Sequence, residues 1–433
     1  MPIYQPEIEC ASRDYLTAIQ SARLIQCVNN AYNNIPFYKK KFDEMGLKPE
    51  DIHSIEDLHK LPFTLKTDLR DNYPFGMFAV DKSKLTRIHA SSGTTGKPTV
   101  VGYTQKDINV WSQAAARALA AAGATINDVI QVSYGYGLFT GGLGLHYGAE
   151  KLGAVALPMS TGNTKRQVQL IQDFESNFLC CTPSYAMYIG ETMAKMGVDP
   201  KTLKLRGGVF GAEPWTDNMR KEIERLLDIE AHDIYGLSEI SGPGVAYDCS
   251  CKDGLHICED FFYPEIIDPE TGENLPDGEF GELVFTCIGK EALPLIRYRT
   301  RDIATLNHEK CECGRTVVRM TKPRGRSDDM LIIRGINVFP SQVEHVLLEM
   351  GVSPNYMIIV DRQNNLDIMK VQVEMNMNTF SDTIKDIEGI CSKISSALQS
   401  TLNVHADVEL VEVGSLPRTE GKAKRVIDNR NIL

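Results

Sequence analysis

The stretch Ser91-Ser-Gly-Thr-Thr-Gly-Lys-Pro-Thr99 decides the fold of this chain, because it gathers hydroxyl side chains, two glycines and a lysine in one short segment. Hydroxyls and glycine N–H groups can wrap phosphate oxygens, and Lys97 adds a point charge. The segment is not a Walker A loop of the form G-x-x-x-x-G-K-S/T, since only two threonines separate Gly93 from Gly96. A Ser/Gly-rich surface loop is the alternative interpretation, and features further along the chain decide between the two.

Four later segments support the phosphate-binding interpretation of the loop, and they follow it in a fixed order. They are Tyr235-Gly-Leu-Ser-Glu239, Tyr298-Arg-Thr-Arg-Asp302, Gly325-Arg-Ser-Asp-Asp329 and Pro417-Arg-Thr-Glu-Gly-Lys422. Together with the loop they resemble the adenylate-forming (acyl-CoA synthetase) superfamily across almost the whole chain. The stretches 134–148 and Gly211-Ala-Glu-Pro-Trp215 are similar to the phenylacetate–CoA ligase group. This resemblance implies an AMP-forming ligase that joins an aryl acetate to coenzyme A through an acyl-adenylate.

The composition is that of a globular protein with more than one domain. The chain has 433 residues, of which 42% are hydrophobic and 24% charged. A net charge of −11 argues against nucleic-acid binding, and no apolar run is long enough to span a membrane. The first residues lack the features of a signal peptide, so we expect a cytoplasmic protein whose eleven cysteines are reduced thiols or metal ligands.

Short apolar runs alternate with helical stretches in most of the chain, which favours a layered α/β architecture. Strands are predicted at 129–134, 155–158, 178–181 and 208–210, and helices at 11–33 and 114–122, with a break at Ile35-Pro36. We therefore predict a large α/β N-terminal domain with layered sheets, residues 1–327.

The pattern changes near residue 327, where a small α+β C-terminal domain, 328–433, is expected after a hinge. Ser341-Gln-Val-Glu344 is a candidate capping box. The helix that it opens should bury Val343, Val346, Leu347 and Met350. Strands at 357–360, 371–375 and 408–413 and a helix at 384–398 complete the predicted unit.

The resemblance implies roles for single residues. Glu239 is the expected Mg²⁺ ligand, because magnesium prefers a few carboxylates together with phosphate oxygens. Asp302 accepts hydrogen bonds only, which suits two ribose hydroxyls, although an ion pair with Arg299 or Arg301 is the alternative. Lys422 is the expected catalytic lysine, because a cation near the α-phosphate offsets the repulsion between two anions.

A basic surface patch around Lys422 with no catalytic role is one alternative. Lys424 is a less favoured candidate for the catalytic lysine, because many relatives have one more residue in this loop. Lys97 is also expected to act in catalysis, by binding the departing phosphates. The residues expected to contact ATP or AMP are Ser91, Ser92, Gly93, Thr94, Thr95, Gly96, Gly211, Ala212, Glu213, Pro214, Asp233, Ile234, Tyr235, Gly236, Asp302 and Arg326.

An aryl pocket is expected where aromatic side chains alternate with glycines, since a flat ring fits between an aromatic wall and bare backbone. The residues that the resemblance places there are Tyr136, Phe139, Gly141, Ala212, Ile234, Gly236 and Pro243. A core turn packed on aromatic rings is the alternative. Phenylacetate, hydroxyphenylacetate and indoleacetate all stay open as substrates, because one pocket methylene changes discrimination by only about 1–3 kcal/mol.

The resemblance also implies that the small domain rotates about Asp328 after adenylation, and that loops around 334–337 then admit the CoA thiol. An acceptor other than CoA, the reverse direction of the reaction and a noncatalytic nucleotide-binding subunit are the competing interpretations. A homodimer is expected from the family, and the residues that bind CoA cannot be named from the sequence.

A separate cluster of thiols predicts a structural zinc site, because soft thiolates with one imidazole suit tetrahedral Zn²⁺. The candidate ligands are Cys249, Cys251, His256, Cys258, Cys311 and Cys313. We favour Cys249, His256, Cys311 and Cys313, with Cys251 in reserve. Unrelated buried or surface thiols are the alternative.

Overall fold

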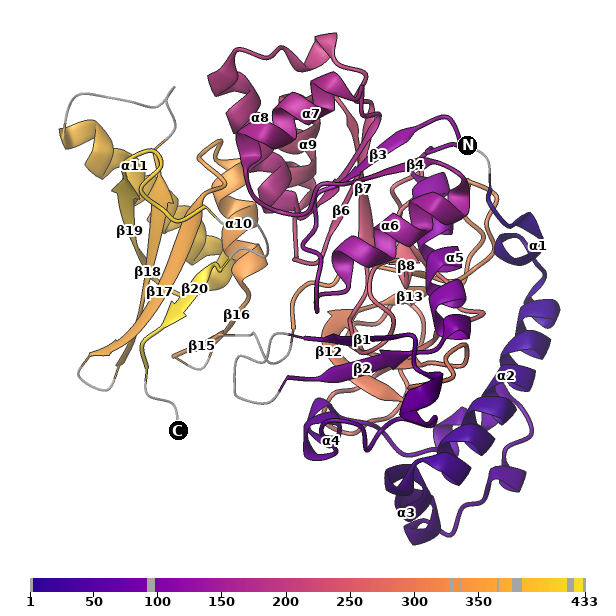
Figure 1. The fold of residues 1–433 in the computed structure, drawn as a ribbon. Coiled ribbons are helices and arrows are strands. Elements are labelled where there is room, and N and C mark those ends of the chain that lie inside the picture. Colours follow the sequence, from indigo (N-terminus) through magenta and orange to yellow (C-terminus); the bar gives the residue numbers. More distant parts are fainter. Residues whose placement is uncertain are drawn as a thin grey trace.

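The computed structural model describes residues 3–91, 98–326, 331–334, 336–363, 366–375, 384–418 and 424–430. These residues form a large domain of layered sheets and helices beside a smaller C-terminal domain (Figure 1). The predicted α/β and α+β architecture is confirmed. The predicted hinge residue, Asp328, lies outside the described residues. None of the helices in the described ranges is both long and apolar enough to cross a lipid bilayer.

A mixed sheet is the framework of the large domain. Its strands are β3 (Val129–Val132), β4 (Val155–Pro158), β5 (Phe178–Cys181), β6 (Gly207–Gly211), β7 (Glu230–Tyr235), β8 (Ala246–Tyr247), β9 (Leu255–Ile257), β13 (Leu306–Asn307) and β14 (Arg319–Met320). They lie in the order β13-β14-β9-β8-β7-β6-β5-β3-β4, with β3 to β7 parallel and the remainder antiparallel. The carboxyl ends of the parallel strands therefore meet at one edge, where β7 delivers the Tyr235–Glu239 segment.

Helices cover both faces of this sheet (Figure 1). They are α5 (Gln105–Ala121), α6 (Gly141–Leu152), α7 (Thr164–Asp173), α8 (Pro183–Met196) and α9 (Asp217–Leu227), with a 3₁₀ turn, η4 (Pro200–Thr202). Alternate residues of β5 reach opposite faces, as the strand period of two requires. Phe178 and Cys180 belong to the core around α5, and Leu179 and Cys181 to the core of α7, α8 and α9.

A second sheet and the N-terminal helices complete the large domain. The sheet contains β10 (Tyr263–Ile267), β11 (Gly281–Thr286) and β12 (Tyr298–Ala304), all antiparallel, and β1 (Arg87–Ala90) pairs with β2 (Val100–Tyr103) in a hairpin. The helices are α1 (Pro6–Glu9), α2 (Arg13–Asn34), α3 (Pro36–Glu44) and α4 (Lys66–Asp71), with 3₁₀ turns η1 (Pro49–Asp51), η2 (Ile55–Lys60) and η3 (Lys82–Lys84). The predicted break at Ile35-Pro36 is confirmed, since α2 ends before it and Pro36 opens α3.

The small domain packs two helices on a four-stranded sheet. Its elements are β15 (Leu331–Ile333), β16 (Ile336–Val338), α10 (Pro340–Glu349), β17 (Tyr356–Gln363), β18 (Leu366–Glu374), α11 (Ile384–Leu402), β19 (Ala406–Val411) and β20 (Val426–Asp428). The sheet order is β19-β18-β17-β20, and its core is separate from those of the large domain.

The predicted capping box at Ser341–Glu344 is wrong. Helix α10 begins at Pro340, whose fixed φ suits the first helical position, and Gln342 Oε1 accepts from the Phe339 N–H at 2.9 Å. The Ser341 hydroxyl instead donates to the Arg324 carbonyl at 2.7 Å. Met350 lies beyond the last helical residue and is 37% exposed, so it does not join the buried face.

The two domains meet where α10 lies against α9 (Figure 1). Leu348 of α10 packs on the core formed by α7, α8 and α9. The Thr216 N–H, at the start of α9, donates to Glu344 Oε1 at 3.3 Å, and Arg418 Nε lies 3.6 Å from Glu191 Oε2. The interface therefore buries a carboxyl group, Glu344, among apolar contacts.

Burial raises the pKa of Glu344 to about 7, with a further increase from Glu213 and an opposing effect of Arg425. A carboxyl whose pKa is higher in the folded protein than in the unfolded chain makes folding less favourable as the pH rises between the two values. The cost of ionising Glu344 is therefore absent at acid pH and complete above about pH 7.

We predict that Glu344→Gln raises the free energy of unfolding by about 2–3 kcal/mol at pH 8, because a neutral amide removes the cost of burying a charge. At pH 5 the gain should be small. Urea titrations at the two pH values measure this difference, and Glu349→Gln on the exposed face of α10 is the matched control. An equal effect of Glu344→Gln at both pH values would contradict the assigned burial cost.

Candidate active site

The ends of the Ser91–Thr99 loop are anchored by the β1–β2 hairpin. Ala90 pairs with Val100, and the Ser91 N–H donates to the Thr99 carbonyl at 2.9 Å. The chain between these residues thus leaves and returns at one point, beside a cavity that Ser91 lines. The predicted contacts Ser92, Gly93, Thr94, Thr95, Gly96 and Lys97 lie outside the described residues, as does Lys422.

The segment after β7 is bent back sharply on itself, which presents Glu239. The N–H groups of Ile240, Ser241 and Gly242 all donate to the Leu237 carbonyl. A Cβ on Gly236 would lie 1.6 Å from the Gly242 carbonyl oxygen, so the backbone here tolerates no side chain. This close approach holds the turn together.

Glu239 lies within that turn, 4% exposed, with Lys66 Nζ 3.3 Å from its Oε1. A buried carboxylate with one cationic neighbour keeps acceptor positions for a metal or a further donor. Lys66 is a residue that the sequence motifs did not single out.

Tyr235, Asp302 and Arg326 come together from distant parts of the chain. The Tyr235 hydroxyl donates to Asp302 Oδ2 at 2.5 Å, and Arg326 Nη1 lies 3.4 Å from Oδ1. Asp302 is 5% exposed, and burial followed by the charge of Asp302 raises the pKa of the Tyr235 hydroxyl. The alternative pairing of Asp302 with Arg299 or Arg301 is wrong.

Both of those arginines pair with Glu282, which is fully buried on the neighbouring strand β11. The reason is the register of the sheet, because Glu282 and Val284 of β11 lie opposite Ile303 and Arg299 of β12.

A narrow cavity of about 120 Å³ lies beside this triad, between the end of β7 and residues 322–326. Its lining contains most of the expected nucleotide contacts: Ala212, Glu213, Pro214, Asp233, Ile234, Tyr235, Gly236, Asp302 and Arg326. Gly211 is not among the lining residues. Trp215 and Lys322 also line it, and the sequence motifs named neither as a nucleotide contact.

Asp233 is a second buried acid of this cavity, 7% exposed. Burial raises its pKa to about 6, against the opposing effect of the Lys322 charge. Lys322 Nζ lies 3.8 Å from Asp233 Oδ2 and 4.7 Å from the centre of the Trp215 ring. The carboxylate therefore keeps an acceptor position toward the cavity at neutral pH.

A larger cavity of about 660 Å³ adjoins the first and shares Ala212, Ile234, Gly236 and Arg326 with it. Of the predicted aryl-pocket residues, Phe139, Gly141 and Pro243 line it as well. Tyr136 does not: its hydroxyl lies 3.4 Å from His146 Nδ1, and its ring meets that imidazole edge-on. The cavity is also lined by Glu239 and by cationic residues that include Lys66, so its lining combines apolar and strongly charged side chains.

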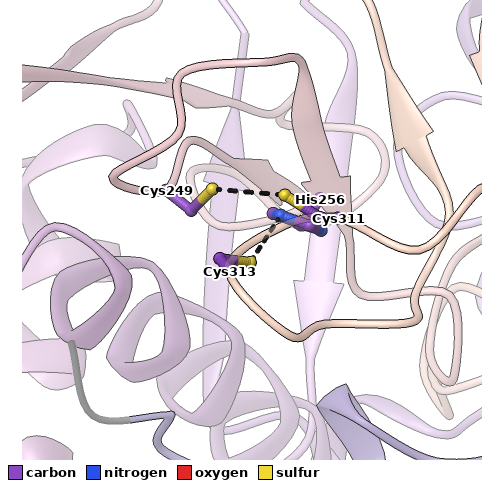
Figure 2. Close-up of side chains that lie close together, drawn as sticks. All are labelled: Cys249, His256, Cys311 and Cys313. Carbon is purple, nitrogen blue, oxygen red and sulfur yellow. Dashed lines mark hydrogen bonds between the residues drawn. The ribbon is translucent and has the colours of Figure 1, made fainter.

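The structure brings Cys249, His256, Cys311 and Cys313 together, with their donor atoms all within 4.8 Å of one another (Figure 2). Cys249 Sγ lies 3.9 Å from Cys311 Sγ, and Cys313 Sγ lies 3.5 Å from His256 Nε2. The Cys311 carbonyl accepts from the Gly314 N–H, and Gly314 has a φ of +95°. This tight turn brings both thiols of the second pair to one side.

The surroundings of the cluster favour a thiolate at Cys313. Hydrogen bonds with Cys249, His256 and Arg315 lower the pKa of the Cys313 thiol, whereas the pKa of Cys249 is raised. Arg315 also donates to the buried carboxylate of Glu9 at 2.6 Å. The cluster is thus tied to helix α1, a contact that the spacing of the cysteines does not predict.

Comparisons with known proteins agree with this architecture. The model described as "AMP-binding enzyme" matches residues 44–288, and "AMP-binding enzyme C-terminal domain" matches residues 335–430. The fold and site therefore define an AMP-binding enzyme. The phenylacetate-coenzyme A ligase of Escherichia coli (strain K12) is 53% identical over 98% of this chain and 98% of its own. The phenylacetate-coenzyme A ligase of Thermus thermophilus is 49% identical over 99% of this chain and 100% of its own. The chain belongs to the phenylacetate–coenzyme A ligase family.

Solved structures add information about the arrangement of the domains. A 2-hydroxyisobutyryl-CoA ligase in the postadenylation state, 29% identical, aligns with a TM-score of 0.92 over 99% of this chain and 94% of its own. The same ligase with 2-HIB-AMP and CoA in the thioesterification state is 30% identical. It aligns with a TM-score of 0.72 over 100% of this chain and 94% of its own. Since both are one ligase, the lower score reflects a different arrangement of its parts. The domains described here are arranged as in the postadenylation structure.

We predict that Gly236→Ala abolishes measurable AMP binding and lowers the free energy of unfolding by about 1–3 kcal/mol, because the added methyl group overlaps backbone that cannot move aside cheaply. Calorimetric titration with AMP and urea unfolding measure the two effects. Gly389→Ala on α11, where an added Cβ meets nothing within 4 Å, is the matched control and should be neutral or slightly stabilising. Normal AMP affinity in Gly236→Ala would show that the turn is not needed.

Proposed function

We propose that this protein is an AMP-forming phenylacetate–CoA ligase, which converts phenylacetate, ATP and CoA into phenylacetyl-CoA, AMP and diphosphate. The observation that carries the proposal is the junction of the two cavities at Ala212, Ile234 and Gly236, in a chain of this family. A nucleotide in the narrow cavity and an aryl acid in the larger one would meet there, with the carboxylate beside the α-phosphate. Bringing two reactants together in this way supplies much of the rate enhancement.

The nucleotide contacts follow from the described geometry. Asp302, oriented by Tyr235 and Arg326, would accept from the ribose hydroxyls. Asp233 would accept from the exocyclic amino group of adenine, and Trp215 and Lys322 would border the base. Gly211, Glu213 and Pro214 are proposed to complete this part of the site, as the motif resemblance implies.

The chemical step is attack by a carboxylate oxygen of the acid on the α-phosphorus. The bond to the bridging oxygen breaks, and its electron pair leaves on pyrophosphate. We assign Lys422 to the approaching carboxylate and α-phosphate, and Ser92–Lys97 to the departing phosphates. Glu239 would hold Mg²⁺, which neutralises phosphate charge when bound, and the buried carboxylate fits that donor requirement.

The aryl group would lie in the apolar part of the larger cavity, against Phe139, Gly141 and Pro243. We propose that the small domain then turns about Asp328 and admits the CoA thiol, which attacks the acyl carbonyl and releases AMP. The likeness to one ligase in two arrangements supports such a rotation. A homodimer is part of the same proposal and rests on the family resemblance; light scattering in solution tests it.

We predict that pyrophosphate release in the presence of ATP and Mg²⁺ is stimulated by phenylacetate, and that adding CoA produces AMP and a thioester in equal amounts. A panel with hydroxyphenylacetate, indoleacetate and a fatty acid measures the preference. Adenylation without a CoA-dependent product would point to another acceptor. No turnover with any carboxylate, despite ATP binding, would favour a noncatalytic nucleotide-binding protein.

We predict that Lys422→Ala lowers the adenylation rate by about 10²-fold or more, because a cation beside the reacting anions is lost. Thioester formation from supplied phenylacetyl-adenylate and CoA should stay within about 2-fold of the unaltered enzyme. Lys424→Ala is the neighbouring control and should retain adenylation. The reverse result, with Lys424→Ala inactive in adenylation, would transfer the role to Lys424.

We also propose that Cys249, His256, Cys311 and Cys313 bind one structural Zn²⁺. Tetrahedral bonds of about 2.3 Å place thiolates about 3.8 Å apart, close to the 3.9 Å between Cys249 and Cys311. The site would join the ends of β8, β9 and the turn before β14, which supports the sheet that carries the active-site turn.

We predict that the purified protein contains about one zinc per chain and that Cys311→Ser lowers this to a small fraction, with a lower midpoint of thermal unfolding. Cys251→Ser should keep its zinc, since Cys251 is not one of the four clustered donors. Metal analysis by mass spectrometry gives the content without reference to activity. Zinc-free wild-type protein that is fully stable would refute the site.

A further inference from the structure

Helix α4 places two cationic side chains in the lining of the larger cavity. Lys66 and Arg70 are separated by one helical turn, at i and i+4, and both line the cavity together with Ser91 and Glu239. Neither belongs to a motif recognised in the sequence. Because both side chains line the same part of the cavity, one anionic ligand could contact both of them.

The position of α4 is set by hydrogen bonds to the strand that carries Asp302. The Thr64 N–H donates to the Arg297 carbonyl, and the Arg299 N–H donates to the Thr64 carbonyl, each at 3.0 Å. The Thr64 hydroxyl is buried and donates to the Ile296 carbonyl at 2.6 Å. Asp68 Oδ2 closes the start of the helix by accepting from the Leu65 N–H at 2.8 Å. Helix α4 is consequently a fixed wall of the site.

The other arginines of this cavity are already matched by carboxylates. Arg299 and Arg301 pair with Glu282, and Arg326 lies beside Asp302. Among the described arginines that line this cavity, Arg70 is therefore the one with no carboxylate partner, while Lys66 of the same helix pairs with Glu239.

Lys66 and Arg70 differ from those arginines. Lys66 contacts Glu239, the proposed metal ligand, at 3.3 Å, and its side chain is 37% exposed, so it can turn toward a ligand in the cavity. Arg70 has no carboxylate within 4.0 Å among the described residues, and within the same residues its buried Nε has no hydrogen-bond acceptor. A buried guanidinium nitrogen without an acceptor is costly, and an anionic ligand would relieve that cost.

We propose that Lys66 and Arg70 bind the pyrophosphate portion of ATP and stabilise it as it leaves. This inference rests on the proposed adenylation activity and adds two phosphate-binding residues to that site. When the bond between the α-phosphorus and the bridging oxygen breaks, the electron pair and its negative charge go to pyrophosphate. Arg70, on a helix fixed by its contacts with β12, meets that charge with little reorganisation, and Lys66 exchanges one anionic partner for another. Lys66 neutralises Glu239 until phosphate oxygens arrive and then donates to them.

A role in binding pyrophosphate would affect only one of the two half-reactions. Pyrophosphate takes part only in adenylation, whereas the second step consumes the acyl-adenylate and CoA and releases AMP. Loss of Lys66 or Arg70 should therefore impair adenylation selectively. A purely structural role of α4 would impair both steps, because the same helix is attached to the strand of Asp302.

The experiment compares the unaltered protein with Lys66→Ala, Arg70→Ala and Arg70→Lys. Phenylacetate-dependent exchange of labelled pyrophosphate into ATP measures adenylation, and thioester formation from supplied phenylacetyl-adenylate measures the second step. We expect the KM for pyrophosphate to rise about 10-fold or more in each alanine variant, with partial recovery in Arg70→Lys. Thioester formation should change by less than about 2-fold. Lys40→Ala, which removes a solvent-exposed lysine of α3, is the control and should behave as the unaltered protein.

An unchanged KM for pyrophosphate, or an equal loss in both half-reactions, would overturn the inference. Calorimetric titration with magnesium pyrophosphate alone separates this outcome from failure of the proposed function. If no carboxylate supports exchange but pyrophosphate binding still weakens in both alanine variants, the phosphate-binding role stands and the ligase assignment fails. If exchange is normal and pyrophosphate binding is unaffected by either variant, the ligase assignment stands and this inference fails.

Discussion

The hydrogen bond between Tyr235 and Asp302 is the constraint on which the site depends. Tyr235 ends a parallel strand of the nine-stranded sheet, and Asp302 lies on the three-stranded sheet, so a 2.5 Å contact joins the two layers. Arg326 approaches the same carboxylate from the segment that leads to the small domain. Tyr235 and Asp302 are buried, so removing the Tyr235 hydroxyl would take away a buried hydrogen bond to a carboxylate, at a cost of about 1–3 kcal/mol. The nucleotide cavity exists because these three segments are held together.

Both cavities depend on this junction. The turn after β7 brings Gly236 against the Gly242 carbonyl and so delivers Glu239 to the larger cavity. Asp233, two residues before Tyr235 on the same strand, faces the smaller one. One strand end thus supplies the proposed nucleotide contact Asp233, residues that line both cavities, and the candidate metal ligand Glu239. Several site residues lie together here because ligands bind at the carboxyl ends of parallel strands.

The contacts between the domains are suited to an arrangement that can be exchanged for another. Among the described residues they include polar pairs around Leu348, one of them made by Glu344, whose ionisation works against its burial. Interfaces between domains of one chain that rest on few contacts generally allow relative motion of the domains, which is compatible with the proposed rotation. The likeness to one ligase in two arrangements, with TM-scores of 0.92 and 0.72, is in keeping with that expectation.

The sequence by itself determined the motifs and the local structure. The apolar runs at 178–181 and 155–158 became strands, and the break at Ile35-Pro36 became a helix boundary, since such features depend on neighbouring residues alone. Spacing could not show where α10 begins, because Pro340 overrode the Ser341 capping pattern.

Only the tertiary structure decided which distant side chains meet. Lys66 and Arg70 reach the cavity because Thr64 is bonded to β12, and Tyr136 is directed to His146 instead of the cavity. The four donors favoured from the sequence, Cys249, His256, Cys311 and Cys313, lie within reach of one another because β9 pairs with β8 and β14. These outcomes depend on strand register and long-range packing, which no short stretch of sequence encodes.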